Sequence, residues 1–197
     1  MAYIPNTAFE TRITNGRYDE TVNITGKYQE SATDVICSAG MLCKRAGLLD
    51  CEGFTAQSIK NENAYIMNQA ESTDDANEVI YASNSYDWNL VSDPVSGGNF
   101  AIGCDTLGLP IPAGRLGTFT EIQFDGKSLY RFGAGNVSGS VSTNKFFTID
   151  DGLLKPAASA PATNGALYFK LVGTGTFTVG TSVGATYYDV IACTAVA

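Results

Sequence analysis

The stretch that decides the fold prediction is Thr118–Phe132, which reads TFTEIQFDGKSLYRF. Within it, Asp125-Gly126 separates two runs of alternating character, Thr118–Phe124 and Lys127–Phe132. Asp followed by Gly tolerates the positive φ angles of a tight type I′ turn, so the two runs predict a β-hairpin. The chain is therefore expected to build antiparallel β-structure around this point.

Two later segments show the same alternation of apolar and polar residues. Residues 167–171 read LYFKL and residues 187–193 read YYDVIAC, so every second side chain would face the same side of a strand. A further short strand is expected at Phe146–Ile149. Together with the hairpin, these segments predict a C-terminal antiparallel β module over residues 107–197.

The first part of the chain has a weaker pattern. In residues 1–36 neither a helical nor a strand period persists, which predicts an extended N-terminal arm. Residues 37–106 are expected to form a mixed, mostly β segment with strands at Ala64–Asn68 and Glu78–Ser83. A helix over residues 55–70 is the alternative by propensity, although Asn61 and Asn63 in its middle disfavour it.

Prolines predict two stiff, extended connectors, at Asp105–Gly114 and at Leu153–Thr163. The first would join the mixed segment to the C-terminal module. The expected fold is therefore mainly β, a β-sandwich-like or partly closed antiparallel barrel with an extended N-terminal arm and at most short helices.

Composition narrows the classes of function. The chain has 197 residues and a net charge of −8, with 16% charged residues, ten Tyr and ten Phe. It has no basic stripe to neutralise phosphates, so direct nucleic-acid binding is disfavoured. No apolar run is long enough to span a bilayer, and no signal peptide is visible, so synthesis in a cytoplasm and no membrane partner are expected.

The residue types that carry chemistry are sparse. The chain has no histidine, which removes Ser-His-Asp and Cys-His arrangements. The carboxylate pairs Asp74/Asp75 and Asp150/Asp151 fall in expected turns without a surrounding signature, so an enzyme is the least favoured class. No catalytic residue, cofactor or metal site is predicted.

The cysteines are odd in number and irregularly spaced, and a zinc site without histidine would need four thiolates. We therefore expect reduced thiols at buried positions. The five are Cys37, Cys43, Cys51, Cys104 and Cys193.

A series of turn and connector patterns carries a resemblance to a known family. Its members are Tyr81–Asn89 (YASNSYDWN), Leu107–Phe119 (LGLPIPAGRLGTF), Leu153–Pro161 (LLKPAASAP), Gly173–Phe177 (GTGTF) and Tyr188-Asp189-Val190. The series is similar to head decoration (capsid cement) proteins of tailed bacteriophages, over roughly residues 35–197. The resemblance implies a structural virion protein that is assembled in the host cytoplasm. It would bind the major capsid protein on the capsid exterior as a homotrimer, and would carry no active site.

Two sets of contact residues follow from these readings. For a capsid protein, the contacts expected are Tyr3, Ile4 and Phe9 in the arm and Arg115 at the start of the strand after the joint. The alternative is a receptor- or glycan-binding module of a phage fibre or surface appendage. That module would place Tyr81, Tyr86 and Trp88 together on an exposed face to stack on a sugar.

Overall fold

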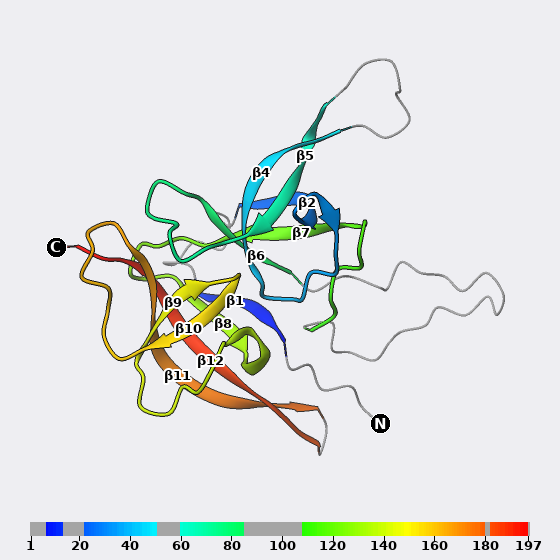
Figure 1. The fold of residues 1–197 in the computed structure, drawn as a ribbon. Coiled ribbons are helices and arrows are strands. Elements are labelled where there is room, and N and C mark those ends of the chain that lie inside the picture. The colour runs from blue at the N-terminus through cyan, green and yellow to red at the C-terminus, as the bar shows by residue number, and fades with distance from the viewer. Residues whose placement is uncertain (1–6, 14–21, 51–59, 85–107, 180–181, 197) are drawn as a thin grey trace.

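The computed structural model describes residues 7–13, 22–50, 60–84, 108–179 and 182–196. Twelve strands in two sheets make up this part of the protein (Figure 1). Its one helical element is a 3-10 turn at Ala134–Asn136. The prediction of a mainly β protein with at most short helices is confirmed.

Five strands of the first sheet close into a barrel, because the pairing of β2 with β7 joins its two ends. The pairing of β2 with β5 is parallel, whereas the other strand pairs of this barrel are antiparallel. A two-residue strand, β3 (Thr33–Asp34), lies against β2 outside the ring. The barrel strands are β2 (Asn23–Glu30), β4 (Leu42–Asp50), β5 (Lys60–Gln69), β6 (Ile80–Ser83) and β7 (Leu116–Glu121).

The second sheet has six strands in the order β1-β8-β12-β11-β9-β10, and its pairings are antiparallel. It lies beside the barrel, and its two central strands, β11 and β12, are the longest of the described chain (Figure 1). Its strands are β1 (Phe9–Ile13), β8 (Leu129–Gly133), β9 (Phe146–Asp150), β10 (Leu153–Ala157), β11 (Leu167–Val179) and β12 (Ser182–Thr194).

The hairpin predicted around Asp125-Gly126 is wrong, because β7 and β8 belong to different sheets. The turn itself exists: Gly126 has a φ of 73°, and Asp125 Oδ1 accepts hydrogen bonds from the N–H groups of Lys127 (2.8 Å) and Ser128 (2.7 Å). Both edges of β7 are already paired, with β2 and with β6. The turn therefore redirects the chain from the barrel to the second sheet.

Three of the short strands are confirmed, and one connector is corrected. Residues 64–68 lie in β5, residues 80–83 form β6 and residues 146–150 form β9. Residues 153–157, expected to be a stiff connector, form β10 instead. Proline is tolerated there because β10 is the edge strand of its sheet, where Pro156 need not donate to a further strand.

The segment expected to be an arm contributes to both sheets. Residues 9–13 form β1, which pairs with β8, and residues 23–30 form β2, which pairs with β5 and β7. From the segment expected as a C-terminal module, β7 closes the barrel. The two sheets therefore interleave segments from along the whole chain, and their boundary does not follow the sequence.

The larger hydrophobic core lies between the barrel and the second sheet. The barrel strands supply Leu42, Ile80 and Ala82 from their outer sides, while the neighbouring residues Cys43 and Tyr81 point into the barrel. The second sheet supplies its inner face, namely Phe9, Tyr130, Phe132, Phe147, Ile149, Leu154, Leu167, Phe169, Val190 and Ala192. In the last two strands, the buried residues Leu167, Phe169, Val190 and Ala192 follow the alternation of faces that the sequence predicts.

The barrel interior is a smaller core. Two glycines, which have no side chain, leave space for it. Gly26 of β2 and Gly117 of β7 are register partners at the closing strand pair. A Cβ atom on Gly26 would lie 2.5 Å from Met67 Cγ, and one on Gly117 would lie 2.3 Å from Ile111 Cδ1. Side chains at these positions would overfill the interior, so both glycines are required by close packing.

Candidate functional site

The strands β11 and β12 continue beyond the second sheet as a two-stranded ribbon (Figure 1). In the ribbon, which we define as residues 174–179 and 182–186, Thr176 pairs with Thr186 and Val179 with Ser182. The pairing of β12 with β8 begins at Tyr187, and the pairing of β11 with β9 involves residues 169–170. Both outer edges of the ribbon therefore have no strand partner among the residues that the structure describes.

The β11–β12 ribbon is unusual in its composition. Residues 171–188, LVGTGTFTVGTSVGATYY, contain no Asp, Glu, Lys or Arg. Open strand edges are commonly protected by charged side chains, and an isolated two-stranded ribbon is marginally stable in water. Val172, at its base, is 56% exposed. An uncharged ribbon with two open edges is suited to packing or pairing against another protein surface.

Side chains on neighbouring strands hold the base of the ribbon. The Arg131 guanidinium of β8 donates to both carboxylate oxygens of Asp189 on β12. Its Cζ lies 3.6 Å from the centroid of the Tyr187 ring, which corresponds to a cation–π contact. The Tyr187 ring in turn covers Gly175, where a Cβ atom would lie 2.4 Å from the tyrosine oxygen. This stack packs the base of the ribbon against β8.

The charges at this base are arranged across three strands. Glu10 of β1 lies opposite Arg131 in register, and its Oε2 is 3.8 Å from Arg131 Nη1. The hydrogen bonds to Asp189 raise the pKa of Arg131, so the guanidinium stays charged at any ordinary pH. Sequence reasoning missed Arg131 and Asp189 because they are 58 positions apart. The uncharged run 171–188 was the visible signal for the ribbon.

A second ribbon leaves the barrel, formed by the outer ends of β4 and β5 (Figure 1). We define the β4–β5 ribbon as residues 48–50 and 60–63, in which Leu49 pairs with Asn61 and Asp50 with Lys60. At its base, Arg45 Cζ lies 5.2 Å from the Tyr65 ring centroid and 5.7 Å from that of Tyr81. Arg45 is exposed whereas Tyr81 is buried, so the guanidinium covers the barrel interior at this end.

The thiols in the described part of the chain are free. Cys37 and Cys43 are buried, and Cys193 is half-buried on the second sheet. Burial raises the pKa of the Cys43 thiol well above its usual value, with Cys37 nearby as a further cause. The expected burial is confirmed for Cys37 and Cys43 and only in part for Cys193, while Cys51 and Cys104 lie outside the described residues.

Of the contacts expected with a capsid, Phe9 is built into the protein's own core. Its side chain is 5% exposed and its ring lies 5.3 Å from that of Phe132 and 6.0 Å from that of Tyr130. Phe9 is thus not an exposed anchor in this structure. Arg115 is exposed where the chain enters β7, and Tyr3 and Ile4 lie outside the described residues.

The alternative sugar platform is not assembled among the described residues. Tyr81 is 2% exposed and points into the barrel. Its ring faces are covered by the protein itself, so they cannot stack on a sugar in this conformation. Tyr86 and Trp88 lie outside the described residues.

The two carboxylate pairs have local partners. Asp74 forms an ion pair with Lys44 and accepts a hydrogen bond from the Glu71 N–H at 2.7 Å. Asp150 pairs with Lys155 at 2.7 Å. Across the described ranges, no three His, Cys, Asp or Glu side chains are grouped so that they could hold a metal ion. The same ranges contain no helix of the length and apolarity needed to cross a membrane.

Comparison with known proteins found no matching family model, no matching curated sequence and no matching solved structure.

Proposed function

We propose that the protein is a structural virion component that binds the outer surface of a tailed-phage capsid and stabilises its lattice. The observation that carries the proposal is the uncharged, open-edged β11–β12 ribbon, joined to a rigid sheet by the Arg131–Tyr187 stack. The similarity of the turn and connector patterns to decoration proteins supplies the partner, the major capsid protein.

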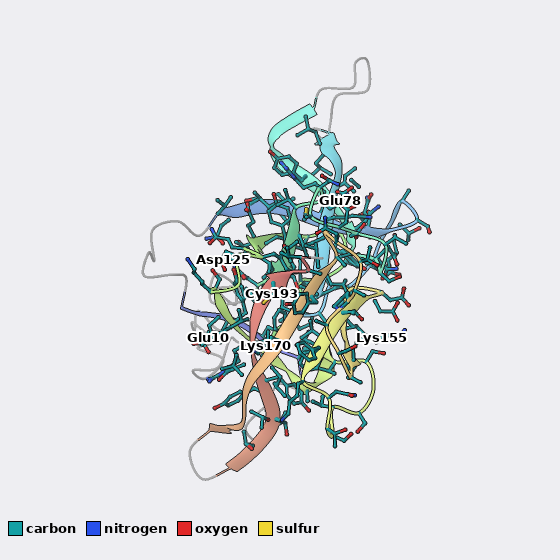
Figure 2. The ribbon with its side chains drawn as sticks, turned by 90° about the vertical axis from the view of Figure 1, so that its left-hand side faces the viewer. Glu10, Glu78, Asp125, Lys155, Lys170 and Cys193 are labelled. Carbon is teal, nitrogen blue, oxygen red and sulfur yellow. The ribbon has the colours of Figure 1, made fainter. Side chains whose placement is uncertain are left out.

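The arrangement of the two ribbons supports a role in bridging subunits. The β4–β5 ribbon and the β11–β12 ribbon leave the body at opposite ends, in both views of the molecule (Figures 1 and 2). A protein that contacts two neighbouring capsid subunits at once adds buried area across their junction. Binding across the junction resists separation of the subunits, which is how a cement protein would stabilise a pressurised shell.

Self-association into a trimer is part of the proposal, since local threefold positions are the expected attachment points. The molar mass of the purified protein, measured by sedimentation equilibrium, tests this directly. A mass three times the 20.8 kDa of one chain supports the trimer, whether free in solution or after release from capsids. A monomer in both states contradicts it.

The function itself is tested by co-sedimentation with capsids that lack the protein. We expect saturable binding to the capsid exterior and a higher temperature for DNA release from the decorated particles. Removing residues 1–6 tests the arm separately, because Tyr3 and Ile4 are lost while β1 is kept intact. Absence of binding by the full-length protein would contradict the proposal. Equal binding by the shortened chain would show that residues 1–6 do not contribute to capsid binding.

A further inference from the structure

A groove runs along the junction of the two sheets, away from both ribbons. It lies where residues 122–128 cross from the barrel to the second sheet and where residues 76–79 lead into β6. Its volume is about 370 Å³. In the view of Figure 2, Glu78 and Asp125 lie on either side of Cys193, above the strands of the second sheet. The groove therefore lies at the crossover, where the chain passes from the barrel to the second sheet.

The floor of the groove is apolar and partly open to solvent. Val79 is 38% exposed, and beside it lie Ile122, Phe124 and Leu167. Phe124 is half-buried, with its ring 5.2 Å from that of Phe169 in the core. The floor is thus anchored to the larger core and presents a fixed apolar surface, which a ligand could cover with a gain in hydrophobic free energy.

The rim of the groove is acidic. Glu78, Glu121 and Asp125 all line it, and no basic side chain among the described residues does. The nearby Lys44 ammonium is already paired with Asp74, and within the described residues neither Glu78 nor Glu121 forms an ion pair. Asp125 accepts three hydrogen bonds from Lys127 and Ser128, which fix the carboxylate in its ionised form. The groove thus combines an apolar floor with an acidic rim, in which Glu78 and Glu121 form no ion pair among the described residues.

We infer that this groove binds an extended segment of a partner protein that carries arginine or lysine side chains between apolar residues. The apolar side chains would cover Val79 and Phe124, and the basic ones would pair with the carboxylates of the rim. Charge complementarity selects this occupant, because an acidic or neutral segment would leave the carboxylates unpaired or repelled. The inference does not depend on the capsid proposal, since it concerns a different surface.

A peptide titration followed by NMR tests the groove. The ¹⁵N-labelled protein is titrated with acetyl-Val-Arg-Val-Arg-Val-amide, and the matched control peptide carries glutamine in place of both arginines. We expect shift changes at the amides of Val79, Phe124 and Thr194 with the arginine peptide and much weaker ones with the control. Each partly exposed ion pair is worth about 2- to 5-fold in affinity, so E78Q/E121Q should weaken binding roughly tenfold.

The control variant is E30Q, which removes one carboxylate charge from β2, outside the groove, and leaves an oxygen to accept the hydrogen bond from the Tyr28 hydroxyl. It should bind the arginine peptide like the wild type. The undisturbed spectrum of each variant shows that it is folded. No shift change at the groove up to about 5 mM arginine peptide would overturn the inference. Equal shifts with both peptides, or unchanged affinity in E78Q/E121Q, would overturn it as well.

Discussion

Arg131 of β8 forms a two-pronged ion pair with Asp189 of β12, with Nε 2.7 Å from Oδ1 and Nη2 2.9 Å from Oδ2. The two residues are register partners, so the pair connects neighbouring strands directly. Both side chains are mostly shielded from solvent, at 14% and 20% exposure. The pair therefore lies in an environment of reduced dielectric, where its geometry can contribute to stability.

We expect a double-mutant cycle of Arg131→Met and Asp189→Asn to give a coupling energy of about 1 kcal/mol in urea unfolding. The matched control is the exposed pair formed by Lys155 and Asp150, for which the cycle K155M and D150N should give a clearly smaller coupling. Equal coupling energies in the two cycles would mean that the two-pronged geometry of the Arg131–Asp189 pair adds nothing to stability.

Closure of the barrel depends on Gly117. We expect Gly117→Ala to destabilise the protein by about 1–3 kcal/mol, because the new Cβ would invade the space of Ile111 Cδ1. Gly47→Ala is the control, since a Cβ there meets no atom within 4 Å, and its effect should be near zero or slightly stabilising. In an Ile111→Val background, which lacks Cδ1, the cost of G117A should fall. An unchanged cost would refute the steric explanation.

The turn at Asp125 should give a pH-dependent contribution to stability. Burial alone would raise the pKa of Asp125, but hydrogen bonds from Ser128 and Lys127 outweigh it, so the pKa lies below the usual 3.8. A carboxyl with a lowered folded pKa stabilises the fold above its unfolded pKa, and this contribution is lost as the pH falls through the folded pKa. Asp125→Ala should therefore cost about 0.5 kcal/mol at neutral pH, since the residue is exposed, and progressively less below about pH 4. If the stability difference between the wild type and Asp125→Ala does not decrease at acidic pH, the ionised Asp125 carboxylate is not its source.

The thiols should differ in their reactivity with iodoacetamide. In a C51S/C104S background at about pH 8, we expect Cys193 to be alkylated slowly in the native protein, because it is half-exposed although burial also raises its pKa. Burial raises the pKa of Cys43, and both Cys37 and Cys43 are inaccessible, so these two should react after urea unfolding only. Peptide mass spectrometry reads the sites of modification. Native alkylation of Cys43 at the rate of Cys193 would show that the barrel opens readily.

Local patterns in the sequence predicted which residues of a single strand share a face. Residues 167–171 and 187–193 alternate because one face packs on the core, and Phe169, Val190 and Ala192 are buried as expected. Strand partners do not follow from such patterns. The Asp125-Gly126 turn has hairpin chemistry, yet β7 had no free edge for β8 because β2 and β6 occupy both.

The strand β2 could not be predicted from the sequence, for a related reason. Its burial is confined to Gly26 and Tyr28, so it shows no long apolar alternation. Its place in the barrel is decided by Gly26 opposite Gly117, which is a contact between distant parts of the chain. The same holds for the ribbon base, where Arg131 and Asp189 meet only in the folded protein. By contrast, the missing charge of residues 171–188 could have been read directly.

The most direct measurement for the central claim is a capsid-binding isotherm of V172K/T176K, which places one lysine at the exposed base of the β11–β12 ribbon and one within the ribbon. The matched control is T33K/I36K, which changes one Thr and one exposed apolar residue on the barrel side; Ile36 is 62% exposed. If the ribbon packs on the capsid, the first variant should lose roughly tenfold or more in affinity, because a charge would be buried without a partner. The control should bind like the wild type. Unchanged affinity of V172K/T176K, with the protein folded, would contradict the role assigned to the ribbon.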